Sequence, residues 1–149
     1  FVIIMIIIVS YIATLVYYQA EKIKNKDVLN FEGKDKEYTQ EVKDKYTEAL
    51  YTCCLLKAGS HYPNKVINSH QYYRFITSIF LHANLSHIAS NLLSTLFITF
   101  YIENFLNSKL KFLTLYFVSG VYGNILSGLV TPGTQGVGAS GSIYGLYSF

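Results

Sequence analysis

The sequence lacks charge at both of its ends. No Asp, Glu, Lys or Arg occurs in residues 1–20 or 112–149, although the 149 residues are 51% apolar and carry a net charge of only +3. A soluble domain spreads its charges over the surface, whereas a membrane protein confines them to segments outside the lipid. This pattern excludes an ordinary soluble domain. The basic residues form no dense cluster, so no nucleic-acid partner is expected.

Cysteine is also scarce. The two cysteines, Cys53 and Cys54, are adjacent, and a disulfide between neighbours would be strained. The sequence has no CxxC pair and no pattern of ligands for a structural zinc site. We interpret both cysteines as small apolar side chains on a helix, and we expect no metal site.

Long apolar stretches predict an all-α, polytopic transmembrane helical bundle. Spanning helices are expected at residues 1–19, 84–103 and 111–130, since a helix needs ~20 residues to cross the hydrocarbon core. A glycine-rich segment at 138–149 predicts the start of a fourth helix, after the turn-forming residues 131–136. A cleaved signal peptide is the alternative for residues 1–19. It would require a basic start and a shorter core, and we therefore prefer a spanning helix.

The polar segment 20–74 predicts a long loop outside the membrane. It holds ten Lys or Arg and eight Asp or Glu residues. One amphipathic helix is expected within it, ending near Gly59, and the chain after His61-Tyr62-Pro63 is expected to be irregular until about Gln71. The apolar positions of this helix lie at helical spacing: Val42, Tyr46, Leu50, Cys53 and Cys54. The short turn with Lys109 and Lys111 is predicted to face the cytoplasm.

Three strongly polar residues remain in otherwise apolar sequence near the second predicted span: His82, His87 and Asn91. Polar groups at membrane depth are costly and are therefore candidates for function. His87 and Asn91 are four residues apart, so they share one helix face and can donate hydrogen bonds toward one point. The alternative is that they only join neighbouring helices. Zinc binding is disfavoured because His82 and His87 are five residues apart.

A second group of residues surrounds Ser140, which lies between glycines where a loop becomes a helix. Small neighbours leave its hydroxyl open to attack a carbonyl, and the free amides of a helix N-terminus can bind a developing oxyanion. The hydrolase motif G-x-S-x-G is not met, because residue 142 is Ser. The alternative is that the glycines pack helices and the serine caps one.

Together, these residues resemble the rhomboid family of intramembrane proteases. The resemblance runs from Gln71 to Tyr147, about half of the chain. Its ordered motifs are an arginine motif in the first loop, H-x4-H-x3-N at the second helix, a Glu at the far end of that helix, and GxSG at the fourth. Here they read QYYRF, HANLSHIASN, Glu103 and Gly138-Ala139-Ser140-Gly141. Tyr73 stands where the family usually has Trp.

The resemblance implies a role for each matching residue. Ser140 resembles the nucleophile of a Ser–His dyad, whose histidine lies on a sixth helix outside these residues. His87 and Asn91 resemble the side-chain part of an oxyanion hole. Tyr144 matches a tyrosine that packs against the catalytic histidine, and His82 matches a position near the active site. Four residues resemble structural positions or allow close approach to the serine: Arg74, Glu103 and the two glycines Gly138 and Gly141.

The implied bundle is incomplete, with about four of six or seven helices, and this fragment alone is expected to be inactive. The implied activity is hydrolysis of transmembrane segments of membrane proteins, without a metal or organic cofactor, by a multi-pass protein in contact with membrane lipid. Two alternatives stay open. One is a non-catalytic rhomboid-like protein that binds or traffics membrane clients. The other is a channel or transporter whose polar residues line a water path.

Overall fold

The computed structural model describes residues 2–25 and 40–149, with the side chains of residues 103 and 104 left out. These residues form helices and no β-strand, which confirms the predicted all-α class. Three helices are long and apolar enough to cross a membrane: Val2–Lys24, Leu85–Ile102 and Lys109–Val130. Many large apolar side chains on them are exposed, as expected for surfaces that face lipid or other helices.

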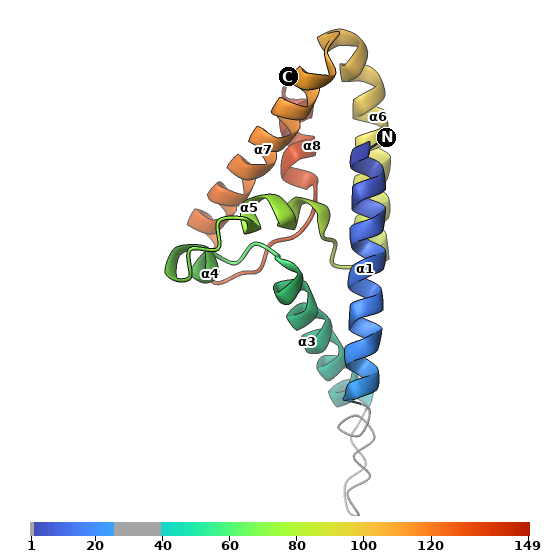
Figure 1. Ribbon diagram of the computed structural model, residues 1–149, viewed down its shortest axis with the longest axis vertical. Helices are drawn as coiled ribbons and strands as arrows, with labels where there is room; N and C mark the ends of the chain where they lie inside the picture. Colours follow the sequence, from blue (N-terminus) through green and yellow to red (C-terminus); the bar gives the residue numbers. More distant parts are fainter. Residues whose placement is uncertain (1, 26–39) are drawn as a thin grey trace, which may run out of the picture.

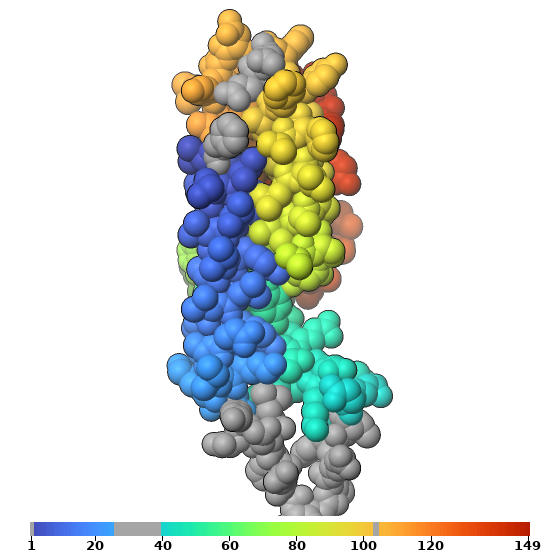
Figure 2. Space-filling view, turned by 90° about the vertical axis from the view of Figure 1, so that its right-hand side faces the viewer, coloured from blue at the N-terminus to red at the C-terminus, as the bar shows by residue number. Residues whose placement is uncertain are grey.

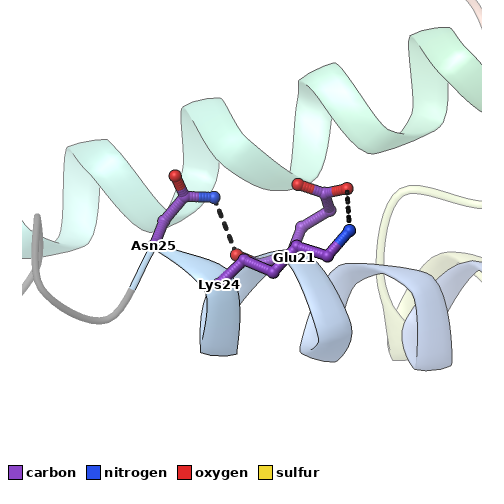
Figure 3. A network of polar contacts seen from close by, with 3 residues as sticks. All are labelled: Glu21, Lys24 and Asn25. Atoms are coloured by element: carbon purple, nitrogen blue, oxygen red, sulfur yellow. Dashed lines mark hydrogen bonds and ion pairs between the residues drawn. The ribbon is translucent and has the colours of Figure 1, made fainter.

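Helix α1 (Val2–Lys24) extends beyond the predicted end at residue 19. Figure 3 shows the polar contacts of its last turn: Lys24 pairs with Glu21 at 3.6 Å, and the Asn25 side chain donates to the Glu21 carbonyl at 2.8 Å. That bond satisfies a carbonyl which the helix end leaves free. Helix α3 (Gln40–Ala58) packs against α1, so the polar last turns of α1 continue beside a second helix.

Helix α3 ends in a Schellman motif at Gly59, which has a φ of 103°. The Gly59 amide donates to Leu56 at 3.3 Å and the Ser60 amide donates to Leu55 at 3.0 Å. The predicted apolar face is wrong in part, because Cys53 is exposed while Leu55 is buried with Cys54. The buried residues of α3, Cys54 and Leu55, lie in its C-terminal half, whereas Val42 near its start is exposed.

The segment between α3 and Gln71 was predicted to be irregular, and this prediction is wrong, because part of it is helical. Pro63–Asn68 forms the short helix α4, with proline in its first turn, where the missing N–H is no loss. Helix α5 (Arg74–Thr77) continues into the 3-10 turn η1 (Ser78–Phe80). The side chain of Arg74 is buried here and donates to the carbonyls of Leu56 and Ser60, both at 2.8 Å. It therefore joins the end of α3 to α5.

Helices α6 (Leu85–Leu106) and α7 (Lys109–Val130) form an antiparallel pair with a tight turn. Asn107 in that turn has a φ of 47°, and the Ser108 side chain accepts from the Lys111 amide at 3.4 Å as the N-cap of α7. Figure 1 shows the short helix α8 (Ser140–Tyr147) between α7 and α6. Figure 2 shows that the first part of α1 runs beside α6.

Candidate functional site

The first turns of α6 carry two of the polar residues singled out from the sequence. Asn84 caps the helix, since its side-chain oxygen accepts from the His87 amide at 2.8 Å. One turn later, the amide group of Asn91 donates to the His87 carbonyl at 2.9 Å, and Asn91 is only 5% exposed. An amide NH₂ has two hydrogens, so this contact leaves one of them for another acceptor.

His82 lies beside this pair, just before the helix. Its side chain is 1% exposed, and its ring lies 5.1 Å from the His87 ring in an edge-to-face arrangement. Nδ1 is 3.3 Å from the Phe80 carbonyl, and Nε2 has no hydrogen-bond partner among the described residues. Burial, together with the neighbouring His87, lowers the pKa of His82 to about 4, so the ring is neutral.

Gly138 brings the loop before α8 against this pair. Its φ is 116°, and a β-carbon built there would stand 2.7 Å from His87 Nε2 and 3.8 Å from Asn91 Nδ2. The Gly138 amide donates to the Ser78 carbonyl at 2.9 Å, which fixes the chain at this point. The polar ends of His87 and Asn91 therefore face the backbone two residues before Ser140, and a larger residue would separate them from it.

Ser140 is the first residue of α8 and its side chain is exposed, whereas the preceding Ala139 is fully buried. Within the described part of the chain, the Ser140 hydroxyl makes no hydrogen bond. Tyr144, one turn later, is 75% exposed on the same helix face. The serine and the tyrosine therefore share an open surface of the bundle, and the hydroxyl is free to meet another group.

Small residues allow α8 to pack closely against α7. Gly141 lies against Gly123, where a β-carbon on Gly123 would stand 3.2 Å from the Gly141 Cα. A β-carbon on Gly145 would overlap the side chain of Ser119. Close backbone approach of this kind is how helices associate in membranes. Gly141 therefore contacts the neighbouring helix, which agrees with a structural rather than a chemical part in the site.

Two predicted residues lie apart from this group. Arg74 lies at the start of α5, where its side chain binds the carbonyls of Leu56 and Ser60 at the end of α3. The side chain of Glu103 lies outside the described residues. In the ranges 2–25 and 40–149, no three His, Cys, Asp or Glu side chains come close enough to hold a metal ion.

Comparison with known protein families assigns the chain to one of them. The profile of the rhomboid domain matches residues 69–149, more than half of the chain. The chain belongs to the rhomboid family. Rhomboids form a family of intramembrane proteases, so this chain is an integral, multi-pass membrane protein.

Individual rhomboids support the same assignment. The chain is 37% identical to RHOMBOID-like protein 2 of Arabidopsis thaliana over 95 residues, which covers 62% of this chain and 29% of that protein. It is 37% identical to Rhomboid-like protease 3 of Toxoplasma gondii over 92 residues, which covers 62% of this chain and 34% of that protein. The chain thus spans about a third of the length of these relatives. No solved structure matches it.

Sequence reasoning missed two residues that fix the chain just before Ser140, Asn124 and Ser78. Asn124 of α7 donates to the Phe75 carbonyl at 2.8 Å and to the Ser78 hydroxyl at 2.9 Å, and Ser78 in turn binds the Gly138 amide. Asn124 is an amide side chain inside an apolar helix, and that signal could have identified it. Nothing in the sequence pointed to Ser78, because its partners lie far away along the chain.

Proposed function

We propose that this chain is part of an intramembrane serine endopeptidase in which Ser140 is the nucleophile. The observation that carries the proposal is the contact of Gly138 with His87 and Asn91, because it sets hydrogen-bond donors beside the chain that leads into Ser140. The exposed and unpaired hydroxyl of Ser140 adds support, since a nucleophile has to reach a carbonyl.

The chemistry divides among these residues as follows. The Ser140 oxygen attacks the scissile carbonyl carbon, and a base takes the hydroxyl proton. The carbonyl oxygen becomes an oxyanion, which the free N–H of Asn91, the ring of His87 and the Ser140 amide stabilise. Collapse of the intermediate breaks the C–N bond, and the amine product leaves with the proton that the base had taken from Ser140. Water then hydrolyses the acyl-enzyme, which releases the acid product and restores the Ser140 hydroxyl.

The base is a histidine from the rest of the protein. Of the four histidines here, His61 and His70 belong to the extramembrane segment, and His82 is buried with a low pKa. His87 lies on the donor side of the proposed site, against Gly138. The resemblance to rhomboids implies that the base is a histidine outside residues 1–149. The substrates are transmembrane segments of other membrane proteins.

The test is labelling of the full-length protein in detergent with a fluorophosphonate, combined with cleavage of a single-pass membrane substrate. Both activities are expected in the wild type and are expected to disappear in Ser140→Ala. Ser148→Ala is the matched control, because its hydroxyl bonds only to the nearby Gly145 carbonyl within the part of the chain that the structure describes. A folded wild type that takes no label and cuts no substrate would overturn the proposal in favour of a non-catalytic protein that binds clients. Labelling that persists in Ser140→Ala would overturn it as well.

A further inference from the structure

The loop that leads to Ser140 is bound to the extramembrane segment some 75 residues earlier in the chain. His61 and Gly136 form an isolated antiparallel bridge, in which the His61 amide donates to Gly136 at 2.9 Å and the Gly136 amide donates to His61 at 2.8 Å. Figure 1 shows this loop running back past α5 beside the connection between α3 and α4. The position of the loop therefore depends on a part of the chain outside the three candidate membrane spans.

Gln135 adds the side-chain contacts to this bridge. Its amide nitrogen lies 2.6 Å from the Ser60 hydroxyl and 3.2 Å from the Thr52 carbonyl. Ser60 is fully buried, so Gln135 reaches into the protein rather than into solvent. A side-chain amide that holds two acceptors on another segment restrains the loop more than a backbone bridge alone.

The partner of Gln135 is itself firmly held. Ser60 follows the Schellman motif that ends α3, and its carbonyl accepts from the Arg74 guanidinium at 2.8 Å. Arg74 also binds the Leu56 carbonyl, so the guanidinium joins two points of the same turn. Gln135 is therefore attached to a turn that a buried, charge-assisted network fixes in place.

At its other end the loop is fixed again, at Gly138. The Gly138 amide binds the Ser78 carbonyl, and Ser78 is held by Asn124 of α7. Only residues 136 and 137 separate the two points of attachment. Loss of the Gln135 contacts therefore removes one of the attachments that set the position of Gly138, which lies against His87, and of Ser140 two residues later.

We infer that Gln135 is a positioning residue for the reaction, which acts through Ser60. It holds the loop so that Ser140 and the donors His87 and Asn91 meet the same carbonyl. The inference rests on the proposed function, since it assigns Gln135 a part in that same site. A misplacement of about 1 Å in such a site costs ~10²-fold in rate. Gln135 itself touches neither the substrate nor the reacting atoms.

The test compares single variants of the full-length protein. Gln135→Ala is expected to lower kcat for a membrane substrate by roughly 10- to 100-fold, with KM changed by less than about twofold, and to slow fluorophosphonate labelling by a similar factor. Ser60→Ala is expected to do the same, and the double variant is expected to be no slower than either single one. Thr134→Ala is the matched control in the same loop, since among the described residues its hydroxyl bonds only to the Thr131 carbonyl.

Rates are normalised to the folded fraction, which thermal unfolding of each variant provides. If Gln135→Ala lowers the Tm but labels at the wild-type rate per folded molecule, the contact is only a structural cross-link and the inference is wrong. Losses that multiply in the double variant would overturn the link through Ser60. If the wild type is labelled at Ser140 and Gln135→Ala is labelled at the same rate, the inference is wrong while the proposed function stands. If the wild type does not label at all, the proposed function itself fails.

Discussion

The imidazole of His87 lies against the backbone of Gly138, with Nε2 2.7 Å from the place where a β-carbon would stand. Gly138 also has a φ of 116°, a conformation that side chains other than glycine rarely adopt. Both features leave this position to glycine alone. The consequence is that the donors on α6 approach the chain just before α8, which a side chain at residue 138 would prevent.

Gly138→Ala is therefore expected to slow fluorophosphonate labelling of the full-length protein by at least about 100-fold and to lower stability by about 2 kcal/mol. Gly133→Ala in the same loop is the control, because nothing lies within 4 Å of its added β-carbon. Equal labelling rates for the two variants would show that the contact with His87 does not matter.

Asn91→Ala is expected to lower kcat by ~10²–10³-fold with little change in KM, because the donor acts on charge that develops in the transition state. Steady-state cleavage of a membrane substrate measures both constants. Leu93→Ala, two residues along α6 and exposed, is expected to leave kcat unchanged. A rise in KM at unchanged kcat would instead assign Asn91 to substrate binding.

Gly145→Ala is expected to destabilise the bundle by about 1–3 kcal/mol, since the new methyl group would overlap Ser119 of α7. Removing that side chain opens the space again, so the double variant Gly145→Ala/Ser119→Gly is expected to recover part of the loss. Thermal unfolding in detergent gives the comparison. A double variant less stable than Gly145→Ala alone would contradict this account of the α7–α8 contact.

Stability is expected to fall below about pH 6.5. Burial lowers the pKa of His61, with a further contribution from the Arg74 charge, and burial lowers the pKa of His82 to about 4. Between about pH 6.5 and these lowered values, the unfolded chain binds protons that the folded chain does not. The neutral rings thus stabilise the fold fully above pH 6.5, and this stabilisation decreases as the pH falls toward 4.

The pH series is measured as Tm in detergent for the wild type and for His82→Gln. The variant is expected to lose less stability between pH 6.5 and 4.5, because one of the two buried rings no longer titrates. The same loss in both proteins would mean that His82 is not responsible for the pH dependence.

The helices in the membrane could be predicted from the sequence because lipid requires long apolar runs, and such runs are visible without any tertiary information. The end of α3 at Gly59 could be predicted for a similar reason, since it depends on the local backbone. The resemblance of the H-x4-H-x3-N and GxSG motifs to those of rhomboids also implied that His87, Asn91 and the loop of Ser140 belong to one site. Their convergence at Gly138 needed the structure.

Other features could not be predicted because they depend on distant contacts. The last turns of α1 persist beside α3, which no local pattern reveals. The buried side of α3 is set by where the bundle meets it, so Leu55 is buried while Cys53 is not. The bond from Gln135 to Ser60 joins two polar residues of ordinary loop sequence, and neither carries a local signal of its partner.

The most direct test of the central claim is an experimental structure of the full-length protein after reaction with a fluorophosphonate. The proposed site predicts phosphorus bonded to Ser140 Oγ, with the phosphonyl oxygen at 2.7–3.1 Å, roughly, from Asn91 Nδ2 and from a ring nitrogen of His87. An adduct on Ser140 whose oxygen contacts neither residue, or an adduct on another serine, would contradict it.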